Sequence, residues 1–200
     1  YIIINNYIKS FKILKLEKTT ILNKINFIQS DAFKLMELNE IPFDFDFYEN
    51  KSIPQKDRDY FIKRFVNHPV YKYKIYGIYV EEVLKSLIVT RVLTVDSSSV
   101  LRVMDYIGDE SHIVFISNYL YQIVIDNNYE YIDFMCFGFT ENVLNKAGFR
   151  KINAESSDII APDYFSPFVQ ENIIVNFMVD TNEVNKIKIC KADGDQDRPS

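Results

Sequence analysis

The chain has 200 residues, of which 48% are hydrophobic and 26% charged, and its formal net charge is −5. This size and balance suit one globular domain with a sizeable core, and they exclude a disordered or fibrous chain. No dense cluster of Lys and Arg alternates with aromatic residues, so no nucleic-acid partner is expected. No apolar run approaches the roughly 20 residues of a membrane span, and a cytoplasmic protein is predicted.

Hydrophobic spacing predicts a strand and two helices in the first third of the chain. Phe11 to Leu16 has the apolar alternation of a strand. Apolar residues at helical spacing then predict an amphipathic helix from Leu22 to Leu38. A second helix is expected from Ser52, with Pro54 in its first turn, to Asn67, because the following His68-Pro69 disfavours α geometry.

The next part of the chain predicts a compact series of strands and helices. A polar turn at Asp96 to Ser99 suits a β-hairpin, Ser111 can cap a helix that runs to Ile125, and Gly148 can end a short helix that starts at Thr140. The strands on either side of the helix from Ser111 should run parallel, because the helix is a crossover between them. The predicted strands are 71–80, 84–95, 100–107, 131–137, 173–179 and 184–190.

The order of these elements, with Asn145-Lys146-Ala147-Gly148-Phe149 at the end of the short helix, resembles the GNAT superfamily of N-acyltransferases. The resemblance covers about residues 11–190 and implies an α/β (α+β) fold: a mixed, mainly antiparallel sheet of six or seven strands flanked by helices. Residues 1–200 would form a single GNAT-like domain. Because the chain opens on Tyr1, the C-terminal part of a longer protein and one half of a tandem GNAT protein stay open as alternatives.

The resemblance implies transfer of an acyl group, most simply acetyl from acetyl-CoA, to an amine of a small metabolite. The stretch Arg64 to Pro69 and the Asp-rich tail resemble a group that is associated with bacterial surface-polysaccharide genes, which implies an amino sugar as the acceptor. A homodimer is left open. In the family, backbone amides after the fourth strand hold the CoA diphosphate. The matching positions here are Ile107, Gly108, Asp109, Glu110 and Ser111, and Asn142 is assigned to the same cofactor.

Two departures from the family pattern favour another function. Asp109 and Glu110 bring negative charge to the place where a diphosphate would dock, and Leu144 stands where many members carry a Tyr that serves as an acid. These residues favour the alternative of a non-catalytic GNAT-like module that binds a ligand or a protein.

Asp105 is the first candidate for catalysis. Strand alternation would place it on one face with Leu101, Val103 and Ile107, and a buried acid on such a face has the raised pKa of a general base. The alternative is a structural ion pair. A three-residue turn at Ser97 to Ser99 would set Arg91 opposite Asp105.

His68 is a second catalytic candidate if it opens onto the cleft between the splayed strands, and the alternative is a packed or capping residue. Tyr71 and Arg91 are assigned to substrate binding. The free thiols Cys136 and Cys190 are expected to be buried and inert, with an acyl-accepting role for Cys136 as the alternative.

The C-terminal tail predicts a further part of the substrate site. Asp193, Asp195, Asp197 and Arg198 should be ordered and pack against its mouth, where their charges would bind an amine or sugar hydroxyls. A solvated end is the alternative. No metal is predicted, because the alternating acids lack the Gly and the bidentate Glu of a calcium loop.

Overall fold

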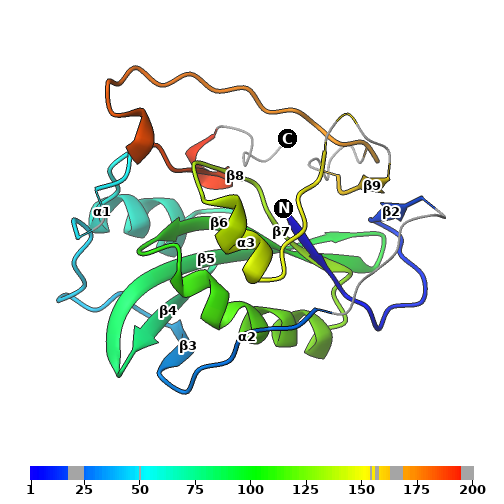
Figure 1. The fold of residues 1–200 in the computed structure, drawn as a ribbon, viewed down its shortest axis with the longest axis horizontal. Coiled ribbons are helices and arrows are strands. Elements are labelled where there is room, and N and C mark those ends of the chain that lie inside the picture. The colour runs from blue at the N-terminus through cyan, green and yellow to red at the C-terminus, as the bar shows by residue number, and fades with distance from the viewer. Residues whose placement is uncertain (18–24, 50, 154, 156–157, 163–168, 195–200) are drawn as a thin grey trace.

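A computed structural model describes residues 1–17, 25–49, 51–153, 155, 158–162 and 169–194. Its centre is a mostly antiparallel six-stranded sheet in the order β1-β7-β6-β5-β4-β3 (Figure 1). The only parallel neighbours in this sheet are β6 and β7, as the sequence predicts. The strands are β1 (Ile2–Ile4), β3 (Phe33–Leu38), β4 (Lys74–Val80), β5 (Val83–Val95), β6 (Ser98–Ile107) and β7 (Tyr131–Phe134).

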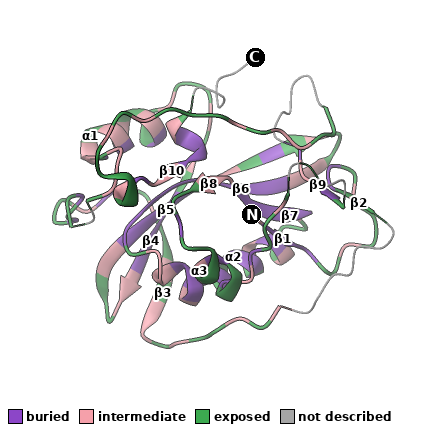
Figure 2. Cartoon of the chain, turned by 45° about the horizontal axis from the view of Figure 1, so that its top comes forward, coloured by how far each residue is buried: buried purple, intermediate pink, exposed green. Residues whose placement is uncertain are grey.

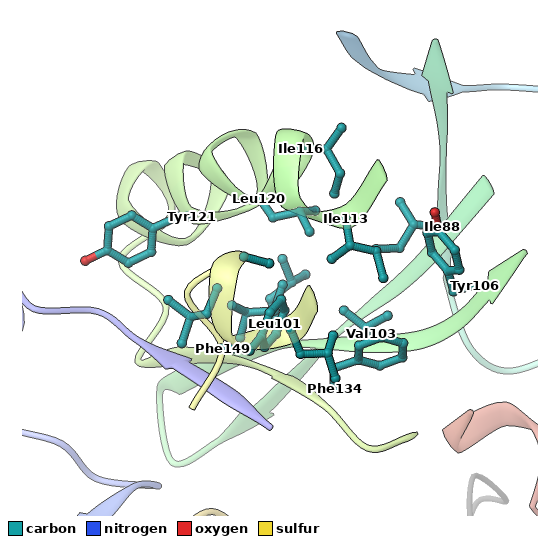
Figure 3. Packing of buried hydrophobic residues seen from close by; sticks show 14 of the residues in the cluster. Ile88, Leu101, Val103, Tyr106, Ile113, Ile116, Leu120, Tyr121, Phe134 and Phe149 are labelled. Atoms are coloured by element: carbon teal, nitrogen blue, oxygen red, sulfur yellow. The ribbon is translucent and has the colours of Figure 1, made fainter. Parts of the chain in front are cut away.

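Helices cover both faces of this sheet, and the α+β class is confirmed. On one face, α2 (His112–Asp126) and α3 (Glu141–Lys146) enclose a core with residues of β5, β6 and β7 (Figure 3). On the other face, α1 (Arg58–Phe61) continues into a π-helical turn, η1 (Ile62–Val66), over a second core. In the described part of the chain, no helix has both the length and the apolar character that crossing a bilayer requires.

Short elements complete the fold. β8 (Cys136–Phe137) pairs with β10 (Ile189–Cys190), and β2 (Lys15–Leu16) pairs with β9 (Ile159–Ile160). Two 3₁₀ turns, η2 (Val184–Lys186) and η3 (Lys191–Asp193), flank β10. Both β10 and η3 also contact β6. The C-terminal segment therefore fills the gap that opens between β6 and β8 beyond the last parallel pair, Val103 with Phe134.

The β5–β6 hairpin differs from the prediction in its turn and its register. Its turn has two residues, Asp96 and Ser97, both with positive φ, the geometry that matches the twist of a hairpin. A bulge follows along the ladder: Val89 pairs with Asp105 and Thr90 with Val103, so Met104 is an extra residue. The strand β6 is almost wholly buried, whereas β3 at the sheet edge is not (Figure 2).

The bulge corrects two predictions about Asp105. Leu101 and Val103 lie in the core beneath α2, but beyond the bulge Met104 and Ile107 lie in the core beneath α1. Asp105 therefore shares a face with Ile107, as predicted, but not with Leu101 and Val103, because one extra residue reverses the alternation. The predicted pairing with Arg91 is also wrong, since the shorter turn sets Arg91 opposite Arg102.

Five other element predictions are wrong in whole or in part. Of the predicted strand 184–190, only β10 forms, and residues 184–186 are the 3₁₀ turn η2. Within the predicted helix 22–38, residues 18–24 lie outside the described residues and 33–38 form β3, because pairing with β4 outweighs the helical spacing. The second helix begins at Arg58, capped by Asp57 and not by Ser52. Of the strand 11–16 only β2 forms. The strand 173–179 does not form, and β10 pairs with β8 instead.

The carboxylate of Glu130 explains why the strand 11–16 is so short. Its oxygens accept hydrogen bonds from the backbone N–H groups of Lys12, Ile13 and Leu14, at 2.6 to 3.1 Å, and from the Ser98 hydroxyl at 2.5 Å. The residue is only 1% exposed. These three consecutive amides bind a buried carboxylate in place of a neighbouring strand, which ties the N-terminal segment to the start of β7.

We therefore predict that Glu130→Ala lowers the free energy of unfolding by about 3–4 kcal/mol, because several buried donors lose their acceptor together. Urea unfolding followed by circular dichroism measures this. The matched control is Glu141→Ala, since Glu141 is exposed and pairs with exposed Lys151, and its loss should stay within about 0.5 kcal/mol. Equal losses of unfolding free energy for the two substitutions would contradict the role of Glu130 as a buried acceptor that stabilises the fold.

Candidate functional site

A pocket of about 660 Å³ lies beside the β8–β10 pair. Its walls come from residues 53–56, 135–137, 175–179 and 189–194. In Figure 1 the segment that contributes 175–179 runs in orange across the top of the molecule, from the neighbourhood of β9 toward the side of α1. Most of the side chains in the wall are apolar, among them Ile53, Met135, Phe137, Val175 and Phe177.

The polar side of this pocket is a buried ionic cluster. The Lys56 ammonium lies 2.5 Å from Asp105 Oδ1 and 2.9 Å from Asp193 Oδ2. The Tyr60 hydroxyl donates to Asp105 Oδ2 at 3.2 Å. The side chains of Lys56, Asp105 and Asp193 are 5%, 0% and 8% exposed. Lys56, Tyr60 and Asp193 line the pocket, whereas Asp105 lies behind them.

Local sequence places each member of this cluster. The bulge in β6 turns Asp105 toward α1, and the backbone N–H of Tyr106 donates to its Oδ1 at 2.8 Å. Asp57 caps α1 by accepting from the Tyr60 backbone, which fixes Lys56 just before the helix and Tyr60 within it. Asp193 is held by the Cys190 backbone N–H at 2.7 Å. Three separate segments thus meet at one ammonium.

Burial and charge determine the protonation of this cluster. Burial alone would lower the pKa of Lys56, but the surrounding negative groups, Asp105 first, outweigh it and raise the pKa, so Lys56 stays charged. Burial raises the pKa of Asp105, and the Lys56 ammonium opposes this only in part. Burial also raises the pKa of Tyr60, which keeps its hydroxyl protonated as a donor. The raised pKa expected for Asp105 is confirmed, and its ion pair forms with Lys56 and not with Arg91.

Three potential metal ligands meet beside the pocket. Ligand atoms of Asp105, Cys190 and Asp193 lie within 4.8 Å of one another, a spacing that could hold a cation. The ammonium of Lys56, however, is within hydrogen-bond distance of both carboxylates. The ammonium of Lys56 therefore occupies the place that a cation bound by both acids would take.

Three predicted site residues gather elsewhere. His68 stacks on Tyr71 with ring centroids 5.1 Å apart, and the Arg91 guanidinium lies 3.3 Å from the centroid of the Tyr71 ring. The Nδ1 atom of His68 accepts from the backbone N–H groups of Val70 and Tyr71, at 3.2 and 2.9 Å. None of the three residues lines the pocket beside Asp105. The structural reading of His68 as a capping residue fits these contacts.

The loop that is predicted to bind the diphosphate contains hydrogen bonds between its own residues and the first turn of α2. Gly108 has a φ of 135° and lies so close to Ser86 that a Cβ atom would meet its hydroxyl at 1.9 Å. Asp109 Oδ1 accepts from the Ser111 backbone N–H, and the backbone N–H groups of residues 112–114 donate to carbonyls of residues 109–111. Asn142 is exposed on α3, two residues after Thr140, which donates to Glu110. Of the amides predicted to hold the diphosphate, that of Ser111 therefore already has a partner in the loop, as do the first three amides of α2.

Glu110 adds negative charge to this loop. Its carboxylate accepts from Thr140 and pairs with Lys188 at 3.1 Å. Partial burial alone would raise the pKa of Glu110, but its hydrogen bonds to Thr140 and Lys188 lower it, so the group stays ionised. The loop thus places two carboxylates beside the amides that are predicted to hold a diphosphate.

The described part of the predicted tail includes Asp193. This residue lines the pocket and pairs with Lys56. Asp195, Asp197 and Arg198 lie outside the described residues.

Sequence reasoning missed the role of Lys56 and Tyr60. Tyr60 stands next to Phe61 and Ile62 in an apolar run, and the polar stretch Gln55 to Arg58 has the composition of a solvent-exposed helix start. No local signal distinguishes Lys56 from a surface lysine, because its burial depends on a bulge in a strand about fifty residues further on.

The chain was compared with protein-family models, with curated proteins and with solved structures, and none of them matches it.

We predict that Lys56→Met lowers the free energy of unfolding by about 3–5 kcal/mol at pH 8, because it leaves buried carboxylates without their cation. The loss should be smaller at pH 5. Without Lys56 the pKa of Asp105 in the native state rises further above its unfolded value of about 4. Between pH 5 and pH 8 the native variant therefore keeps a proton on Asp105 that the unfolded chain releases, so the free energy of unfolding falls as the pH rises. Urea unfolding at both pH values measures this.

The control for this substitution is Lys63→Met, because Lys63 pairs with Asp59 on the surface and both side chains are more than 70% exposed. Its effect should stay within about 0.5 kcal/mol at either pH. A loss for Lys56→Met that does not change between pH 5 and pH 8 would contradict the charge assignment.

Proposed function

We propose that the chain binds a small primary amine carrying an apolar group, with the ammonium held by Asp193 and the apolar group against the pocket walls. The observation that carries this proposal is the ionic cluster of Lys56, Asp105 and Asp193: with both acids ionised they share one ammonium, and an additional cation would neutralise these three groups. The expected amino sugar remains a prediction. The apolar walls favour a less polar amine, because sugar hydroxyls would need polar partners there.

The hydrogen bonds of the cluster assign different roles to the two acids. Asp105 has both oxygens occupied, Oδ1 by Lys56 and the Tyr106 backbone and Oδ2 by Tyr60, and it lies behind the pocket. Among the described residues, the donors to Asp193 all reach Oδ2, which leaves Oδ1 to a ligand. Asp193 would therefore meet the amine directly, and Asp105 would position Lys56.

A charge-assisted bond of this kind should be visible in a matched pair of probes. We expect phenethylamine to bind about tenfold or more tightly than 2-phenylethanol in isothermal titration, because only the amine is charged. Asp193→Asn should remove most of this difference. Asp44→Asn, which changes an exposed acid outside the pocket, should preserve it.

Each outcome of this titration decides a different part of the proposal. Binding of neither probe by the folded protein would contradict the function itself. Binding of glucosamine in place of phenethylamine would keep the amine site and reject the apolar group. Equal binding of phenethylamine and phenylethanol would reject Asp193 as the recognition group. Circular dichroism of each variant separates lost binding from lost folding.

Acyl transfer is the second candidate function, supported by the parallel β6–β7 pair joined through α2 in the order that resembles GNAT proteins. In such a reaction Asp193 would hold the acceptor amine and take up the proton that it loses. The two acids of the loop oppose this candidate. If the loop nevertheless holds acyl-CoA, the double substitution Asp109→Asn and Glu110→Gln should strengthen binding by removing negative charge.

We expect millimolar acetyl-CoA to leave the melting temperature of the unchanged chain unaltered, because of these acids. Thermal shift assays with the unchanged chain and the double variant measure this. Stabilisation of the unchanged chain by acetyl-CoA, and not by adenosine alone, would reverse the order of the two candidates. Stabilisation of neither protein would remove the second.

A further inference from the structure

The two free thiols of the chain lie opposite each other. Cys136 in β8 and Cys190 in β10 are register partners in an antiparallel pair. Directly opposed residues of such a pair project to the same side, with Cα atoms about 4.5–5.5 Å apart. This lies within the range of about 4.4–6.8 Å that a disulfide bond requires. The sequence separates these residues by a whole helix and a long loop, so only the fold brings them together.

Both cysteines line the pocket beside the ionic cluster. Cys136 is partly exposed, and Cys190 is 3% exposed and sits just before the turn that carries Asp193. Next to Cys136, Gly138 has a φ of 82°, and a Cβ atom there would lie 1.8 Å from the carbonyl oxygen of Ile187. Glycine at this position thus permits the close approach of the two chain segments on which the thiol pair depends.

We propose that Cys136 and Cys190 are a redox modification site, a dithiol that a low-molecular-weight disulfide converts into an intramolecular disulfide at the pocket wall. The Cys136 thiolate attacks one sulfur of the oxidant and displaces a first thiol. The Cys190 thiolate then attacks the Cys136 sulfur of this mixed disulfide and displaces the second thiol. Two electrons pass to the oxidant, and the two protons of the cysteine thiols leave with its two halves.

The surroundings of the thiols determine the order of these steps. Cys136 is the more accessible of the two, so it reacts with the external oxidant first, and buried Cys190 resolves the intermediate. Burial raises the pKa of Cys136 to about 12, so the first step is slow at neutral pH. The second step is intramolecular and benefits from the high effective concentration of a fixed neighbour.

The new bond would fix the strand that leads into the substrate side of the pocket. β10 is bound to β8 through only two residues on each strand, and Asp193 follows β10 directly. A covalent link from Cys136 to Cys190 would hold Asp193 at a set distance from the wall. This proposal does not depend on the identity of the ligand.

The test uses the full chain and oxidised glutathione as the probe. After incubation under native conditions, intact mass spectrometry should show loss of two hydrogens, and digestion without reduction should yield a cross-linked peptide pair containing Cys136 and Cys190. The cross-linked form should exceed the glutathione adduct about tenfold or more, because the second step is intramolecular. Dithiothreitol should restore the original mass, and the oxidised chain should melt at a higher temperature.

Single variants identify the order of attack. Cys190→Ser should accumulate a glutathione adduct at Cys136, whereas Cys136→Ser should react many times more slowly. A stable adduct at Cys136 in the unchanged chain, a dimer linked between chains, or no reaction of the native chain would each overturn the proposal. The experiment on the unchanged chain is decisive even where a variant fails to fold.

Discussion

The buried ammonium of Lys56 is the interaction on which the pocket depends. It joins a residue just before α1, a residue of the central strand β6 and a residue of the C-terminal turn η3. A charge in this position is unfavourable alone, and each partner in the cluster compensates for part of the lost hydration. The three segments therefore depend on one another, and the apolar pocket forms where they meet.

A single extra residue in β6 makes the contact between Asp105 and Lys56 possible. Without the bulge at Met104, Asp105 would lie on the α2 side of the sheet, among aliphatic side chains and away from Lys56. With the bulge, the same acid lies on the α1 side. Bulges occur often next to functional sites because they redirect one side chain without ending the strand. The position of Asp105 is thus a property of the ladder and not of its alternating sequence.

The C-terminal segment converts the gap between splayed strands into a walled pocket. β10 pairs with β8 and, with η3, packs against β6, so the segment occupies space that ligands could otherwise enter between the strands. The same segment supplies Asp193 and Cys190. Just after β6, Asp109 accepts from the Ser111 backbone, and Glu110 pairs with Lys188, which precedes β10. The proposed amine site lies on the β8–β10 side.

The sequence by itself determined the hairpin of β5 and β6, the crossover helix α2, the parallel pair around it and the burial of an acid at position 105. Each of these features depends on local signals: turn residues, helix caps or the periodicity of apolar residues. Tertiary structure alone decided the strand character of 33–38, the partner of Asp105 and the pairing of Cys136 with Cys190. These outcomes depend on contacts between segments far apart in the chain. A lysine such as Lys56 carries no local sign that it will be buried, and only the folded sheet selects it.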